Sequence, residues 1–249
     1  MKSGKASNPN ITQLTPIEAT VLEHVANYGL TTRDVWQDGD LANTDIASVG
    51  AAARSLTRSG LLEVGNLYHG RHYFVLTHRG IDQVKHSTVR PGLLSEPDKI
   101  QSYAKLLLLC IFRTDLRTVL AAPLVKQFGE GLRGIASRFL LKRDEQPFLA
   151  FLRIDTRVQS RPSRAAQAIR GDILRFARHP NLALVMKRQR FEYLWITATQ
   201  ARADAVLAHF RTYARVGKSQ FTIVVMPKLL PLLVGVQINK EMFIPRKQP

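Results

Sequence analysis

In residues 15–86, the spacing of the apolar residues changes in a definite order: three segments with helical spacing come first, and two short stretches typical of strands follow. The first segment starts at Thr15-Pro16-Ile17-Glu18, where a capping hydroxyl, a proline at the first helical position and an acid at the third favour a helix start. Apolar residues keep helical spacing up to Tyr28, and Gly29 is a natural stop. The pattern predicts a first helix of about 13 residues.

Two further helices are expected before the strands. Thr31 and Thr32 can cap a short helix through Val35 and Trp36, which the cluster 38–40 (Asp-Gly-Asp) then ends. A third helix opens at Thr44 and Asp45 and ends at Gly60. Its expected apolar face consists of Ile46, Val49, Ala53 and Leu56.

The strands Leu61–Val64 and Tyr73–Leu76 are expected to form a hairpin with a basic tip at 65–72. Thr77 can cap one more helix, through Ile81 and Val84. The first domain is therefore expected at 15–86.

The remaining boundaries follow from composition. Residues 1–14 are polar and are expected to be a flexible leader. Residues 87–97 hold turn formers and two prolines, which indicate a linker. A second domain is expected at 98–249, an α/β domain that joins two subunits and has a basic surface.

The second domain alternates helical and strand patterns. The expected elements are a helix at 100–112, paired strands at 135–141 and 148–154 around a turn at 144–147, a helix at 164–178, strands at 182–186 and 193–197, a helix at 201–213 and a strand at 221–226. Such alternation favours a mixed sheet with helices on its faces. The fold class expected for the whole chain is α/β (α+β).

The charge of the chain is strongly positive. Thirty-six Lys and Arg against nineteen Asp and Glu give a net charge of +17 and a pI near 10.6. Residues 133–190 hold fourteen of the basic residues and four acids, a local net of 14 − 4 = +10. The expected partner is a polyanion, because DNA, RNA and acidic membrane surfaces all attract such a charge.

Other features narrow the choice. The apolar run Lys105–Phe112 is far shorter than the roughly 20 residues of a spanning helix. No secretory signal is evident at the start, so we expect a cytoplasmic protein without membrane partners. Cys110 is the single cysteine, which excludes an intramolecular disulfide and a cysteine-based zinc cluster.

The third helix has the residue types that duplex DNA requires. Small or polar residues let a helix approach base edges in the major groove, and arginine contacts guanine or phosphate. The candidate DNA-binding residues here are Thr44, Ser48, Gly50, Ala51, Arg54, Ser55 and Arg58. The alternative is an alanine-rich core helix that is packed on all sides.

The hairpin tip adds an aromatic residue, two histidines and an arginine around a glycine. Arg71 suits a narrow minor groove, and Tyr68, His69 and His72 can bond phosphates. The alternative is an ordinary solvated tip. A zinc site at the two histidines is not expected, because no cysteine or acid within the hairpin completes a tetrahedral set.

Three helices followed by a two-stranded wing resemble the winged helix-turn-helix superfamily. The likeness covers about 70 residues, and Ser48–Leu62 is similar to its recognition helix and exit strand. It implies a homodimer that reads two half-sites. The expected dimer interface is one of two apolar runs, Ile100–Cys110 or Leu229–Val236.

The segment Phe148–Arg157 resembles the core of the restriction-endonuclease-like fold, in which a strand carries an acid-x-Lys signature and an earlier acid completes a magnesium site. Together with the wing, the chain resembles the replication-relaxation family of plasmid and mobile-element proteins. Arg153 stands where a catalytic relative often has an acid, and Asp144 lies in a turn, poorly placed to share a metal with Asp155. Asp155 is instead expected to cap the next helix or to pair with Arg157.

These observations favour a sequence-specific double-stranded DNA-binding protein, a homodimeric transcriptional regulator of a plasmid or mobile element. No metal, cofactor or small-molecule ligand is expected, and no phosphate-binding loop or nucleophile elbow occurs. One alternative is a replication or mobilisation accessory protein that binds origin DNA. The other is a Mg²⁺-dependent nuclease.

Overall fold

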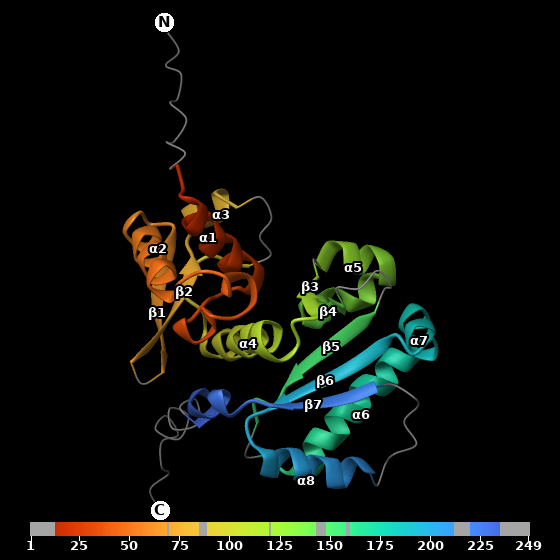
Figure 1. Cartoon of the computed structure of the whole chain (residues 1–249). Coiled ribbons are helices and arrows are strands. Elements are labelled where there is room, and N and C mark those ends of the chain that lie inside the picture. Colours follow the sequence, from red (N-terminus) through yellow and green to blue (C-terminus); the bar gives the residue numbers. More distant parts are fainter. Residues whose placement is uncertain are drawn as a thin grey trace, which may run out of the picture. The chain divides into compact units, whose positions relative to one another are not determined.

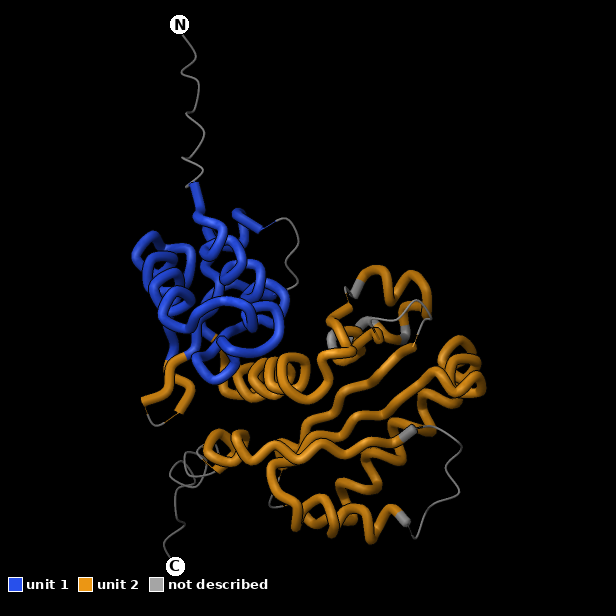
Figure 2. The backbone as a smooth tube through the Cα atoms, in the orientation of Figure 1, with its two compact units in different colours: residues 1–65, 73–93 blue, residues 66–72, 94–249 orange. Residues whose placement is uncertain are grey.

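The computed structural model describes residues 13–68, 70–84, 89–119, 121–142, 148–157, 160–211 and 220–234. The chain forms two compact units, residues 1–65 with 73–93 and residues 66–72 with 94–249 (Figure 2).

Unit 1 contains the helix α1 (Pro16–Tyr28), which begins and ends as the sequence predicts. Thr15 accepts a hydrogen bond from the Glu18 backbone N–H at 3.3 Å, and the Glu18 carboxylate accepts one from the Thr15 N–H at 2.9 Å. Gly29 ends the helix in the left-handed region, with φ 88°. The capping box and the glycine stop are thus confirmed.

The expected short second helix is present only as a 3₁₀ turn. The chain makes two short 3₁₀ turns, η1 (Arg33–Val35) and η2 (Gly39–Leu41), and Thr32 makes no side-chain capping bond. Too few residues lie between Thr32 and Gly39 to recover the cost of nucleating an α-helix. Burial of Trp36 and Leu41 holds the segment in place instead.

The third expected helix is α2 (Ile46–Arg58), which Asp45 caps by accepting a hydrogen bond from the Ser48 N–H at 2.9 Å. One face of α2 packs into the core with α1 and Trp36, and Val49, Ala53 and Leu56 are fully buried there. The helix is thus confirmed, with most of its apolar face.

The hairpin is longer than predicted. Its strands are β1 (Leu62–Tyr68) and β2 (Arg71–Leu76), so residues expected in the connecting loop belong to the strands. The sequence was misleading at Gly65, which indicates a turn but lies inside β1. A Cβ on Gly65 would lie 2.2 Å from Cζ of Tyr73, so the glycine makes room for that buried ring.

The helix α3 (His78–Asp82) is shorter than predicted and packs directly on the start of β1. The Thr77 hydroxyl accepts from the Gly80 N–H at 3.1 Å and donates to the Gly60 carbonyl at 2.7 Å. A Cβ on Gly80 would lie 2.1 Å from the Leu61 carbonyl oxygen. Only glycine permits this approach of two backbones.

We therefore expect Gly80→Ala to destabilise unit 1 by about 1–3 kcal/mol, because the added methyl collides with backbone and cannot be accommodated by a rotamer change. Chemical denaturation measures the loss. His78→Ala, at an exposed position of the same helix, is the matched control and should change stability little. Equal stability of the two variants would contradict the close packing of α3.

His24 is a titratable group inside the core of unit 1. Its side chain is 1% exposed, its ring lies 4.7 Å from that of Tyr28, and within the described residues neither ring nitrogen has a hydrogen-bond partner. Burial lowers the pKa of His24 from 6.5 to about 4, against a smaller opposite effect of Asp40. The folded protein therefore keeps this imidazole neutral at pH values where the unfolded chain protonates it.

Because the folded-state pKa of His24 is lowered, its contribution to stability is present above pH 6.5 and is lost as the pH falls towards 4. The loss amounts to roughly 3 kcal/mol in the free energy of unfolding. Denaturant titrations across this pH range, followed by the fluorescence of Trp36 in unit 1, measure this change in the free energy of unfolding. His24→Leu should flatten the dependence, and an unchanged pH slope in that variant would contradict the assignment.

Unit 2 is built on a mixed sheet, as the sequence predicts, and the described residues form five strands, of which the first was not predicted. The strand order is β3 (Leu116–Thr118), β4 (Phe139–Lys142), β5 (Leu149–Ile154), β6 (Phe191–Thr197) and β7 (Gln220–Val225). The pairs β3–β4 and β4–β5 are antiparallel, while β5–β6 and β6–β7 are parallel. The α/β fold class is thus confirmed at the level of a mixed sheet with helices.

The helices and helical turns of unit 2 are α4 (Glu96–Leu107), its π-helical extension η3 (Leu108–Phe112), α5 (Ala121–Phe128), η4 (Glu130–Arg138), α6 (Pro162–Arg178), α7 (Pro180–Lys187), α8 (Gln200–Arg211) and η5 (Pro227–Leu229). In Figure 1, α6 and α8 lie on one side of the sheet and α4 on the other. Helix α4 begins inside the expected linker, where Ser95 caps it.

The part of the chain that the structure describes holds no helix long and apolar enough to span a bilayer.

Two strand predictions in unit 2 are wrong. Residues 182–186 belong to α7, which starts at a favourable N-terminal Pro180, and a short apolar run does not distinguish strand from helix. Residues 135–138 belong to η4, so β4 starts later than expected. The expected turn at 144–147 lies outside the described residues.

The core on one side of the sheet is aromatic. Alternate strand residues Phe151, Tyr193 and Trp195 face this side, where Ile169, Ile173 and Phe176 of α6 pack. The rings of Phe151 and Phe176 are 4.7 Å apart. This packing fixes which face of α6 points inward.

The two apolar runs expected to join subunits are largely buried within the chain. Ile100, Tyr103 and the run 106–110 are at most 3% exposed, and so are Leu229, Leu232 and Leu233. Residues 235–236 lie outside the described part. Most of the apolar side chains in both runs therefore serve the fold of the chain itself. Leu230 and Val234 of the second run are exposed, at 39% and 41%, and a dimer interface at either run stays a prediction.

Candidate nucleic-acid interface

The outward face of α2 is small, basic and free of acids. Ala51, Arg54 and Arg58 are exposed, as is Ala47, which the sequence analysis did not select. No acid occurs within α2, and in the described part of the chain neither guanidinium contacts a carboxylate. We call Ala47, Ala51, Arg54 and Arg58 the α2 face. The alternative of a helix packed on all sides is wrong.

Two of the selected α2 residues turn towards the protein. Gly50 is buried, and a Cβ there would lie 3.2 Å from the Trp36 ring. A hydrogen bond with the Ser55 hydroxyl is the main reason why the pKa of Glu18 in α1 is lowered. Both residues therefore help α2 to pack.

The start of α2 holds the other two selected residues. Thr44 and Ser48 are half-buried, and the Ser48 hydroxyl donates to Asp45 at 3.0 Å, inside the N-terminal cap. Arg54 reaches back towards this end, since its Nη1 lies 3.5 Å from the position of a Cβ on Gly50. The periodicity of 47, 51, 54 and 58 was available in the sequence and would have identified Ala47.

The hairpin carries the remaining candidates. Arg71 and His72, at the start of β2, are exposed, whereas Tyr68, at the end of β1, is half-buried. Gly70 adopts φ 74°, which suits the turn between the strands. His69 lies outside the described residues.

Asp155, at the end of β5, forms a buried ion pair that the sequence analysis did not find. Its carboxylate accepts from Nε of Arg202 in α8 at 2.8 Å, and the two side chains are 6% and 8% exposed. Arg202 also bonds the carbonyl and hydroxyl of Ser160 and the carbonyl of Arg157. The pair thereby holds the loop after β5 to α8.

This geometry corrects the expectations for Asp155. Its partner is Arg202 and not the Arg157 side chain, and it caps no helix, because α6 begins only at Pro162. The Arg157 N–H reaches the carboxylate at 3.4 Å. Sequence spacing does not predict a partner 47 residues away.

Arg153 is also engaged in an ion pair. Its guanidinium contacts the Asp172 carboxylate of α6, which also accepts from the Tyr193 hydroxyl at 2.9 Å. Burial raises the pKa of Tyr193, so its hydroxyl stays a donor. Asp144 lies outside the described residues, and among those described no three His, Cys, Asp or Glu side chains gather as a metal site would need.

The chain was compared with protein-family models, curated proteins and solved structures, and none of the three comparisons found a match. The resemblance to winged helix-turn-helix and replication-relaxation proteins therefore stays a prediction.

The burial of the Asp155–Arg202 pair predicts how its variants change the free energy of unfolding. Removing one partner, in Asp155→Leu or Arg202→Met, leaves a buried charge unpaired and should cost about 3–5 kcal/mol. The double variant Asp155→Leu/Arg202→Met should cost much less than the sum, because no orphan charge remains. Urea denaturation of the four proteins measures the coupling, and additive losses would show that the pair does not act as a unit.

Proposed function

We propose that this protein binds double-stranded DNA sequence-specifically, with α2 in the major groove and the hairpin against the backbone. The observation that carries the proposal is the α2 face, where two arginines stand among alanines with no acid in the helix. Arg54 and Arg58 lie about 6 Å apart along the helix axis, a distance that covers about two base pairs of a duplex. The flanking alanines let the helix backbone come close to the bases.

The hairpin supports the same reading. It follows α2 directly in the chain, and its exposed Arg71 and His72 are side chains that bond phosphates. In the proposal these contacts fix the orientation of the protein, while α2 reads the sequence. The net charge of +17 supplies the long-range attraction that such binding needs.

The proposal includes a homodimer that acts as a transcriptional regulator of a plasmid or mobile element. One helix reads only a few base pairs, so two linked copies multiply specificity. Sedimentation with and without DNA tests the dimer. Footprinting across the gene's own upstream region and across an origin of replication separates regulation from origin binding.

We expect Arg54→Ala and Arg58→Ala each to reduce the preference for specific over scrambled DNA by about 1–3 kcal/mol, because a lost base contact affects only the correct site. The specific duplex is first selected from a random pool by the wild-type protein, and affinities are then measured by fluorescence anisotropy. Arg33→Ala, which removes an exposed charge outside α2, is the control and should keep the ratio. An unchanged ratio in both α2 variants would refute the proposed reading helix.

Arg71→Ala should behave differently, because a phosphate contact is blind to sequence. We expect weaker binding of both duplexes and a plot of log K against log salt that is shallower by about 1. Binding measured at four or more salt concentrations gives the slope. A slope equal to that of the wild type would place Arg71 away from the backbone.

A further inference from the structure

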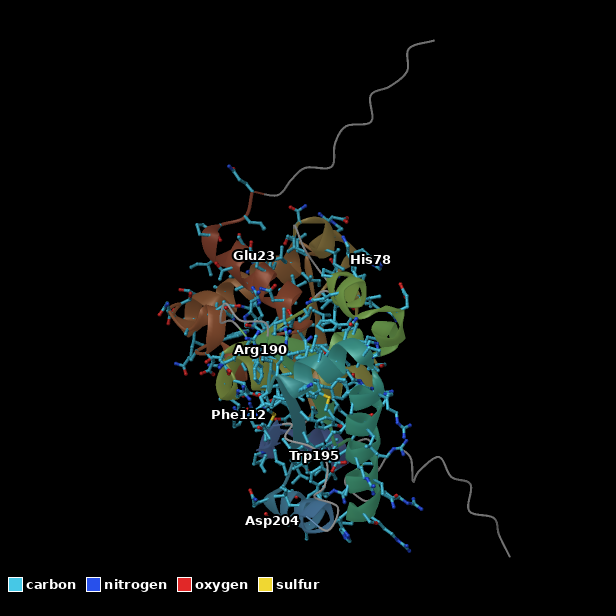
Figure 3. The ribbon with its side chains drawn as sticks, turned by 90° about the vertical axis from the view of Figure 1, so that its right-hand side faces the viewer. Glu23, His78, Phe112, Arg190, Trp195 and Asp204 are labelled. Carbon is cyan, nitrogen blue, oxygen red and sulfur yellow. The ribbon has the colours of Figure 1, made fainter. Side chains whose placement is uncertain are left out.

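Helix α6 presents a second basic surface, in unit 2. Its outward side carries exposed Arg164, Gly171, Arg175 and Arg178, which recur at intervals that keep them on one side of a helix. We call these four residues the α6 face. Nitrogen-tipped side chains project from the teal ribbon of α6 into solvent in Figure 3.

The charge of the α6 face is not neutralised within the described part of the chain. Asp172 is the only acid in α6, and its side chain is 14% exposed because it turns inward to Arg153. Arg175 keeps one contact with Asp172 at 3.4 Å and is still 56% exposed. The guanidinium groups of Arg164 and Arg178 contact no described carboxylate, which leaves a row of positive charge facing solvent.

Gly171 in the middle of the α6 face has no structural explanation in the packing. A Cβ there would meet no atom within 4 Å, and its backbone is ordinary helix. Glycine weakens a helix interior relative to alanine, so packing alone favours a larger residue. A missing side chain is useful where a ligand approaches the helix backbone closely.

We propose that the α6 face binds the phosphodiester backbone of double-stranded DNA without regard to sequence. Arg164 and Arg178 are about 21 Å apart along the helix axis. A duplex presents one negative charge per roughly 1.7 Å of its axis, so several phosphates lie within reach of such a row. This contact goes beyond the reading role of α2 and does not depend on it.

Two other polyanionic partners fit the α6 face less well. A membrane-surface helix inserts its apolar side into lipid, but Ile169, Ile173 and Phe176 of α6 are buried in the protein core. Single-stranded nucleic acid is held largely by stacking on aromatic side chains, and the only aromatic residue of α6 is that buried phenylalanine. Charge without aromatics favours the duplex backbone.

The open position at Gly171 allows a sharp test. Gly171→Glu adds a carboxylate to the middle of the face without removing an arginine, and Gly171→Gln is its neutral match in size. On a 30-base-pair duplex of random sequence, we expect the Glu variant to bind roughly five- to tenfold more weakly than wild type, with a salt slope lower by about 1. The Gln variant should bind as wild type does.

Thermal unfolding of both Gly171 variants shows whether they fold, and the same titrations are run with single-stranded DNA and with vesicles that contain phosphatidylserine. Equal duplex affinity of the Glu and Gln variants overturns the proposal. So does a loss confined to single strands or to vesicles, which would assign the face to that partner.

A second pair of variants tests the arginines themselves. Arg164→Gln/Arg178→Gln should lower the salt slope by about 2, while Arg117→Gln/Lys126→Gln removes two exposed charges elsewhere in unit 2 and should lower it less. The α6 variants should bind selected and scrambled duplexes more weakly by the same factor. The test of the α6 face therefore works even if the protein proves to have no sequence preference. Equal slopes for the two double variants overturn the proposal.

Discussion

The packing of α2 against α1 and Trp36 decides which side chains of α2 reach solvent. Val49, Ala53 and Leu56 fill the core of unit 1, so the helix cannot rotate without exposing them. Gly50 lets the Trp36 ring approach, and Ser55 ties α2 to Glu18 of α1. The α2 face is therefore a consequence of the core, and its arginines are held at fixed positions on a rigid element.

Three carboxylates of unit 2 are turned inward and pair with arginines there. Asp155 pairs with Arg202, Asp172 with Arg153, and Glu192, only 4% exposed, with Arg113 at 2.8 Å. Each pair joins segments distant in sequence, so the loss of either partner would leave an unpaired charge inside the unit. Each pair engages one acid and one arginine, so the pairs leave the net positive charge of the unit unchanged.

Local signals in the sequence predicted local structure well. The Thr15–Glu18 box, the Gly29 stop and the Asp45 cap each depend on residues a few positions apart, and the structure contains all three. Glycines were harder to interpret. Gly65 is needed because the Tyr73 ring packs against it, and Gly80 because the Leu61 carbonyl does, and only folding brings these groups together. The run 182–186 failed for a related reason, since its short apolar pattern fits either a strand or a helix.

The candidate sites divide in the same way. Helical spacing was enough to select Ala51, Arg54 and Arg58, but it did not separate them from the inward Gly50 and Ser55. The partner of Asp155 required the parallel arrangement of β5 and β6, which brings the end of β5 to the start of α8. No local pattern encodes such a contact.

The two proposed surfaces differ in what they can contribute to binding. In the proposal, the two arginines of the α2 face distinguish bases, but so few contacts would give little affinity over competing DNA. The α6 face has three arginines, and the single acid of that helix, Asp172, is turned inward. Contacts of such arginines with the phosphate backbone would raise affinity for every duplex alike. Under the two proposals, the choice of site is separate from the strength of attachment, and positive charge is then expected well beyond the helix that is proposed to read sequence.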